Sequence, residues 1–153
     1  DSKNNNFVGC FTKGMNNQKY IMVNSNIDNI GRKNFTMAHE LGHYFLNHHL
    51  KQNTFYCVEG EILEDSIHTS QIEQEANYFA TCLLMPEEKI TSAFKALLSN
   101  SKKAHTQDYL LVKNSNYSIW RGICDALTKR YGVSEAALRY RLKSLKLADF
   151  QLS

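Results

Sequence analysis

The sequence lacks the features that mark membrane and secreted proteins. No apolar run approaches the roughly 20 residues that cross a bilayer, and the first residues do not have the form of a signal peptide. The four cysteines are scattered, without a C-x-x-C pair. A chain of 153 residues can bury a core without disulfides. We therefore expect a cytoplasmic protein with reduced thiols and no membrane partner.

A strong charge of either sign is also lacking. The formal net charge is +3, which is too weak to indicate a nucleic-acid partner without a clustered basic patch. The sequence has no internal repeat, and its 42% hydrophobic and 22% charged residues are typical of a globular chain. We expect one domain over residues 1–153.

The pattern of apolar residues predicts an α+β fold. Runs rich in Val, Ile, Phe and Tyr flank GMNNQ and predict a β-hairpin at about 7–24, with a further short strand near 54–58. Pro86 ends one predicted helix, and Gly132 caps another. Helical spacing predicts five helices, at about 34–49, 70–85, 87–99, 117–131 and 134–146. We expect a small antiparallel sheet packed on these helices.

The first of these helices carries the segment HELGH, residues 39–43. At 100° per residue His39 and His43 lie one turn apart on one side, with Glu40 at the edge of that side. We expect the opposite side to face the core and His48 to lie on the surface. Four apolar residues share the expected core side: Met37, Ala38, Leu41 and Phe45.

H-E-x-x-H on a helix has a chemical interpretation. Two imidazoles at i and i+4 can bind one Zn²⁺ at about 2.0–2.1 Å. The Glu beside the first ligand would take a proton from the water that the metal activates, and would later give it to the leaving amine. His39 and His43 are therefore candidate ligands, and Glu40 is the candidate general base.

The third ligand must come from elsewhere, since a catalytic zinc usually takes three protein ligands. The metzincin pattern H-E-x-x-H-x-x-G-x-x-H is not met, because position 46 is Leu rather than Gly, although position 49 is His. The alternative is a carboxylate on a later helix, as in the thermolysin-like arrangement. Glu73 and Glu75 both flank the apolar stripe of the second long helix, so periodicity does not choose between them. The ligand set suits zinc but can hold other divalent ions.

Two blocks of the sequence resemble the ImmA/IrrE family of zinc metallopeptidases. FTMAHELGH matches the family pattern F-T-x-A-H-E-x-G-H, and EANYFATCLLMP matches E-A-N-x-F-A-x-x-L-L-M-P. YGVSEAALRYRLKSLKL is similar to the closing helices of the family, so the resemblance covers about residues 20–147. It implies a zincin-like α+β fold with a thermolysin-like minimal core, whose zinc lies between the first two long helices.

The resemblance also implies roles for single residues. His39 and His43 would be zinc ligands, Glu40 the general base and Glu75 the third ligand, with Glu73 as its alternative. Asn77 would support the site or the packing of its helix. The family implies an endopeptidase that cleaves a helix-turn-helix transcriptional repressor, and so releases genes of a mobile element or a stress response.

A second hypothesis belongs to another class of protein. The segment ALTKRYGVSEAALRYRLKSLKL has the form of a helix-turn-helix, whose second helix could lie in the major groove of DNA. In this hypothesis the protein is a DNA-binding regulator, and its metal site is not catalytic. We do not expect direct DNA binding, because the net charge supplies little attraction to phosphate. The basic residues on or near that helix are Arg139, Arg141, Lys143 and Lys146.

Overall fold

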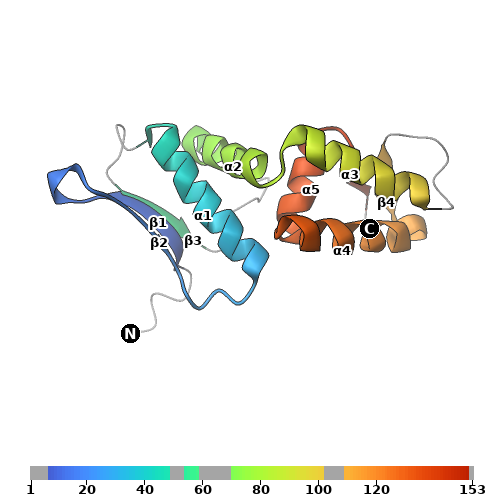
Figure 1. The fold of residues 1–153 in the computed structure, drawn as a ribbon, viewed down its shortest axis with the longest axis horizontal. Coiled ribbons are helices and arrows are strands. Elements are labelled where there is room, and N and C mark those ends of the chain that lie inside the picture. Colours follow the sequence, from blue (N-terminus) through green and yellow to red (C-terminus); the bar gives the residue numbers. More distant parts are fainter. Residues whose placement is uncertain (1–6, 49–53, 59–69, 102–108, 152–153) are drawn as a thin grey trace. The chain divides into compact units, whose positions relative to one another are not determined.

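A computed structural model describes residues 7–48, 54–58, 70–101 and 109–151. By its internal contacts the chain divides into two compact units, Asp1–Leu83 and Leu84–Ser153. That residues 1–153 form one domain stays a prediction. Each unit contains helices and a small sheet (Figure 1), which confirms the predicted α+β class.

The first unit is a three-stranded sheet and two helices. Strand β1 (Phe7–Lys13) lies in the centre, and both β2 (Lys19–Val23) and β3 (Thr54–Val58) pair with it antiparallel. The turn η1 (Met15–Asn17) joins β1 to β2. Asn16 and Asn17 have φ of 60° and 61°, so the asparagines of GMNNQ supply the left-handed backbone on which the predicted hairpin depends.

Helix α1 (Ile30–Phe45) begins and ends four residues earlier than predicted. The side chain of Asn29 accepts a hydrogen bond from the backbone N–H of Arg32, which caps the helix at a segment expected to be a loop. After Phe45 the backbone of Asn47 has φ of 58°, which turns the chain out of the helix. His48 is therefore not a residue of α1.

The predicted core side of α1 is confirmed at Ala38, which is 3% exposed, and is wrong at Met37 and Phe45. Met37 is 48% exposed and Phe45 is 60% exposed, whereas His39, Glu40 and His43 are at most 1% exposed. The physical reason is that α1 packs against the sheet and also against helix α2 (Gln71–Leu84), as Figure 1 shows. The sheet and α2 together bury a large part of the surface of α1, including its polar side.

Small residues bring α1 and α2 together. A Cβ atom at Gly42 would lie 3.1 Å from the Cα of Ala76, 3.2 Å from its carbonyl oxygen and 3.3 Å from the ring of Phe79. Ala76 and Ala80 are fully buried. The two backbones therefore approach closely at the turns of α1 that carry His39 and His43.

The second unit contains three helices and a two-stranded parallel sheet. The elements are α3 (Glu87–Asn100), β4 (Leu110–Lys113), η3 (Asn114–Asn116), α4 (Tyr117–Tyr131), α5 (Glu135–Ser144) and β5 (Ala148–Gln151). The three helices lie close to their predicted bounds, and the two strands were not predicted. Gly132 ends α4 with φ of 60°, and the Ser134 side chain caps α5 by accepting from Ala137.

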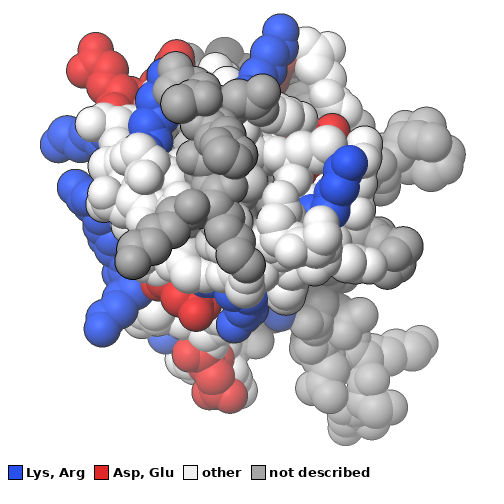
Figure 2. Space-filling view, turned by 90° about the vertical axis from the view of Figure 1, so that its right-hand side faces the viewer, with Lys and Arg blue, Asp and Glu red and all other residues white. Residues whose placement is uncertain are grey.

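Two basic residues of α5 are used within the second unit. Arg141 is 2% exposed and donates from Nε to the carbonyl oxygen of Met85, 3.1 Å away. The guanidinium of Arg139 lies 4.2 Å from the ring centre of Phe150. On the face drawn in Figure 2, lysine and arginine side chains are interrupted by uncharged and acidic ones. Among the described residues, no helix is both long and apolar enough to cross a membrane.

The close contact at Gly42 predicts that replacing glycine with alanine has opposite effects on stability at Gly42 and at Gly122. Gly122→Ala on α4 places its Cβ in open space, so helix propensity should raise the free energy of unfolding by up to about 1 kcal/mol. Gly42→Ala should lower it, because overpacking against the Ala76 backbone costs roughly 1–3 kcal/mol. Urea denaturation followed by circular dichroism measures both. Equal effects of the two substitutions would contradict the close approach of α1 and α2.

Candidate metal centre

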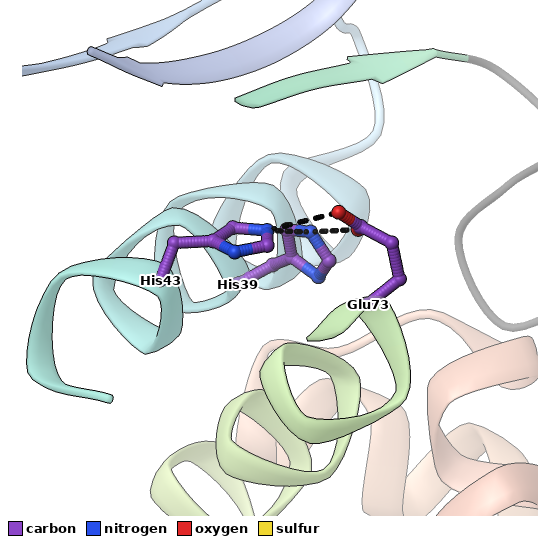
Figure 3. A group of neighbouring side chains, drawn as sticks. All are labelled: His39, His43 and Glu73. Atoms are coloured by element: carbon purple, nitrogen blue, oxygen red, sulfur yellow. Dashed lines mark hydrogen bonds and ion pairs between the residues drawn. The ribbon is translucent and has the colours of Figure 1, made fainter. Parts of the chain in front are cut away.

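Three side chains from α1 and α2 converge on one point (Figure 3). The Nε2 atoms of His39 and His43 lie 3.0 Å apart. Glu73 places Oε2 at 3.0 Å from Nε2 of His39, and Oε1 at 3.4 Å from Nε2 of His43. One possible ligand atom from each residue lies within 4.8 Å of the others. Both histidines are buried, and the side chain of Glu73 is 25% exposed.

The start of α2 positions Glu73. The backbone N–H of Glu73 donates to the hydroxyl of Ser70 at 3.4 Å, and that of Gln74 donates to the Ser70 carbonyl at 3.0 Å. Ser70 thus caps the helix and places Glu73 in its first turn. Asn77 follows one turn later on the same side of α2. The pair Glu73 and Asn77 therefore faces the pair of histidines on α1.

The three residues fit a divalent metal. Ligands at about 2.0–2.1 Å in a tetrahedral site lie about 3.3 Å from one another. The separations of 3.0, 3.0 and 3.4 Å among the nitrogen and oxygen atoms are close to this value. Two imidazoles and one carboxylate are also a donor set that catalytic zinc uses with one position left open. The residues present could therefore hold zinc.

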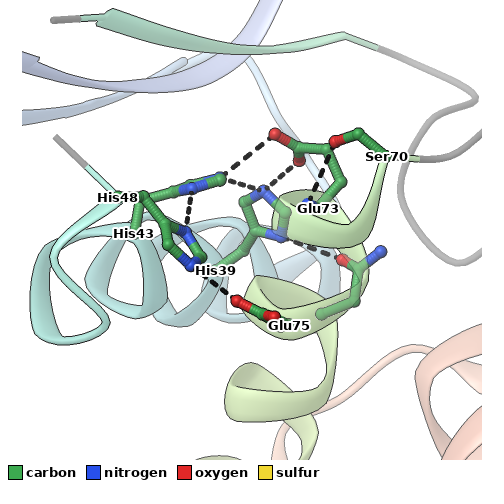
Figure 4. A network of polar contacts seen from close by, with 7 residues as sticks. His39, His43, His48, Ser70, Glu73 and Glu75 are labelled. Atoms are coloured by element: carbon green, nitrogen blue, oxygen red, sulfur yellow. Dashed lines mark hydrogen bonds and ion pairs between the residues drawn. The ribbon is translucent and has the colours of Figure 1, made fainter. Parts of the chain in front are cut away.

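The other ring nitrogens of the two histidines have partners of their own (Figure 4). Nδ1 of His39 lies 2.9 Å from Oδ1 of the buried Asn77, and an amide oxygen can only accept. Nδ1 of His43 lies 2.9 Å from Nδ1 of His48. Partners at Nδ1 orient both rings and leave Nε2 directed at the point shared with Glu73.

The structure does not bring Glu75, the predicted third ligand, to this point. Its Oε2 lies 3.1 Å from Nε2 of His48, and its Oε1 accepts from the side chain of Gln71 at 2.8 Å. The reason is helical geometry. Glu75 is two residues after Glu73, about 200° around the helix, so the two carboxylates cannot serve the same point. The alternative, Glu73, lies beside the two histidines.

Glu40 is fully buried next to this group. Among the described residues no donor meets hydrogen-bond geometry with either carboxyl oxygen, although the backbone of Phe11 favours the charged form. Burial raises the pKa of Glu40 to about 7, with His39 lowering it and Glu73 raising it. A carboxyl whose pKa lies near neutrality can both accept and return a proton.

Without metal, the two histidines and Glu73 interact directly with one another. Burial lowers the pKa of His43, so its imidazole tends to be neutral. Burial alone would raise the pKa of Glu73, but hydrogen bonds from His39 and His43, together with their charge, lower it to about 2. Glu73 is thus ionised, as ligation requires, and a metal would take the place of the hydrogens that the two histidines direct at it from Nε2.

His48 is the residue of this site that sequence reasoning missed. It was expected on the surface, and it is 2% exposed. The expectation assumed that α1 runs through His49, and the earlier end of the helix overturns it. The asparagine at position 47 is the one signal that could have indicated this, because Asn tolerates the left-handed backbone that ends helices.

Comparison with known proteins gives two matches. The family model described as IrrE N-terminal-like domain, of the peptidase family M78, matches residues 5–143. Metallopeptidase ImmA of Bacillus subtilis (strain 168) is 34% identical over 77 residues, which are 50% of this chain and 41% of that protein. The chain thus aligns with less than half the length of this curated relative.

The family match runs through both compact units and includes the two helices that bring His39, His43 and Glu73 together. The chain belongs to the ImmA/IrrE family of metallopeptidases.

Proposed function

We propose that the protein is a zinc-dependent endopeptidase whose ligands are His39, His43 and Glu73. The observation that carries the proposal is the convergence of two buried imidazoles and one carboxylate, each with an atom within 4.8 Å of the others. The buried Glu40 beside them supports the enzyme over a structural metal site. Burying a carboxyl is costly, and catalysis gives a reason to keep it.

Glu40 has the proton-transfer role in this proposal. Zinc, when bound, polarises the substrate carbonyl and lowers the pKa of water. One carboxyl oxygen of Glu40 accepts a proton as the water attacks the peptide carbon. The same carboxyl then donates that proton to the amine nitrogen when the carbon–nitrogen bond breaks. A pKa of about 7 suits both directions of transfer near neutral pH.

The substrate in this proposal is a cytoplasmic helix-turn-helix repressor, whose cleavage releases genes of a mobile element or a stress response. This part rests on the resemblance to the ImmA/IrrE family, since the described residues identify the site and not its substrate. Three of the cysteines, Cys10, Cys82 and Cys124, are free thiols, which suits a reducing compartment.

Metal content distinguishes the two candidate carboxylates. Protein purified without added metal should hold about one zinc per chain, and both His39→Ala and Glu73→Ala should lose it. Glu75→Ala should retain zinc at stoichiometric concentration, because its carboxylate faces His48. Elemental analysis of the four proteins is the measurement. Zinc lost in Glu75→Ala and kept in Glu73→Ala would restore the ligand predicted from the sequence.

Glu40→Gln should separate metal binding from catalysis. The amide keeps the shape of the side chain but cannot take a proton, so cleavage should fall by roughly 10²–10⁴-fold while zinc content stays unchanged. The assay co-expresses the full-length protein with each repressor encoded beside its gene and follows the repressor by immunoblotting and mass spectrometry. Glu88→Gln, an exposed change on α3, is the control. Undiminished cleavage by Glu40→Gln would refute the role of Glu40.

The DNA-binding hypothesis predicts a different result for the basic residues of α5. Because Arg141 is buried on the Met85 carbonyl, Arg141→Met should lower the free energy of unfolding by about 1–3 kcal/mol. Lys143→Met, at an exposed position of the same helix, should leave stability unchanged. We expect no DNA binding in 50 mM salt by either variant or the wild type. Salt-sensitive binding that Lys143→Met weakens would favour the regulator.

A further inference from the structure

We propose that His48 and Glu75 form a relay that fixes the tautomer and the orientation of His43. The inference rests on the proposed zinc site and assigns a positioning role to two residues outside its ligand set. The relay is a chain of contacts from the buried site to the surface (Figure 4). Nδ1 of His43 lies 2.9 Å from Nδ1 of His48, and Nε2 of His48 lies 3.1 Å from Oε2 of Glu75.

The proton positions along this chain follow from its outer end. An ionised carboxylate can only accept, so Nε2 of His48 carries a hydrogen and donates to Glu75. In a neutral imidazole the other nitrogen is then an acceptor, and Nδ1 of His48 can receive a hydrogen bond. His43 must therefore donate from Nδ1, which leaves the lone pair of its Nε2 directed at Glu73 and the metal point.

The opposite arrangement fails at both ends. If His48 donated from Nδ1, its Nε2 lone pair would face the carboxylate of Glu75 at 3.1 Å. His43 would then accept at Nδ1 and carry its hydrogen on Nε2, where it could not ligate a metal. The carboxylate of Glu75 thus favours the binding-competent form of a histidine that it does not touch, whereas Glu73 favours a hydrogen on Nε2 of His43 until a metal takes that place.

Burial makes the relay effective. His43 and His48 are at most 2% exposed, so water cannot readily replace the hydrogen bond between them. The Glu75 side chain is 41% exposed, and Gln71 holds its second oxygen at 2.8 Å. Outer partners of this kind typically change metal affinity by about 10–100-fold. His39 has a simpler partner, since the amide oxygen of Asn77 accepts directly from its Nδ1.

The test is zinc affinity, measured by competition with a chromogenic chelator on the full-length protein. Glu75→Leu and His48→Leu should each weaken zinc binding by about 10–100-fold. His48→Asn should recover most of the loss, because it gives His43 the amide oxygen that His39 already has. Glu75→Leu in the His48→Leu background should cost little more, since Glu75 acts only through His48. Glu88→Leu, exposed on α3, is the control and should bind zinc as the wild type does.

A spectroscopic readout separates the relay from a merely structural effect. In zinc-loaded protein with ¹⁵N-labelled histidine, a scalar coupling across the hydrogen bond should join Nδ1 of His43 to Nδ1 of His48. Glu75→Leu should abolish or weaken this coupling while circular dichroism stays unchanged. Additive losses in the double variant, or an unchanged coupling in Glu75→Leu, would overturn the relay. A wild type that binds no zinc would instead overturn the proposed function, and the relay with it.

Discussion

Burying two histidines and a glutamate on one side of α1 is the constraint on which the rest of the first unit depends. A buried polar group without a partner costs about 1–3 kcal/mol, and a whole domain is stable by only about 5–15 kcal/mol. Partners for both histidines are therefore a condition of folding as well as of function. Glu73 and Asn77 from α2 and His48 from beyond the end of α1 supply them. These partners reach the histidines because Gly42 and Ala76 let the two helices approach closely.

Glu40 differs from the two histidines in how its buried polar group is paired. Its neighbours on α1 have partner side chains for their ring nitrogens, whereas the fully buried Glu40 carboxyl meets the backbone of Phe11 rather than a partner side chain. Strand β1 comes so close that a Cβ atom at Gly9 would lie 3.3 Å from Oε1 of Glu40. The fold therefore holds this carboxyl in place and leaves its proton affinity high, with a pKa of about 7. A residue selected for stability alone would be expected to have a partner or to be apolar.

Local sequence signals predicted where most helices and strands lie. Tertiary packing decided which of their side chains are buried and which carboxylate meets the histidines. The asparagine turn after β1 and the caps at Gly132 and Ser134 are set by neighbouring residues, so the sequence located them. The prediction buried Met37 and Phe45 in place of His39 and His43 because the periodicity rule assumes that a helix is covered on one side only. Glu73 and Glu75 flank the same apolar stripe, so only the placement of α2 against α1 separates them. Strands β4 and β5 have four residues each and pair across 38 positions of sequence, which leaves little local signal.

The i, i+4 spacing makes His39 and His43 equivalent on the helix, and their surroundings make them different. Nδ1 of His39 faces a neutral amide oxygen, while Nδ1 of His43 faces an imidazole that contacts a carboxylate. A hydrogen bond that ends on a carboxylate raises the electron density of the donating ring more than an amide does, which makes it a stronger ligand. In the proposed relay, the carboxylate predicted from the sequence as the third ligand acts on the metal point through two imidazoles. Because it lies at the surface, substitutions near Gln71 and Glu75 can tune the site without changing a residue that faces the metal.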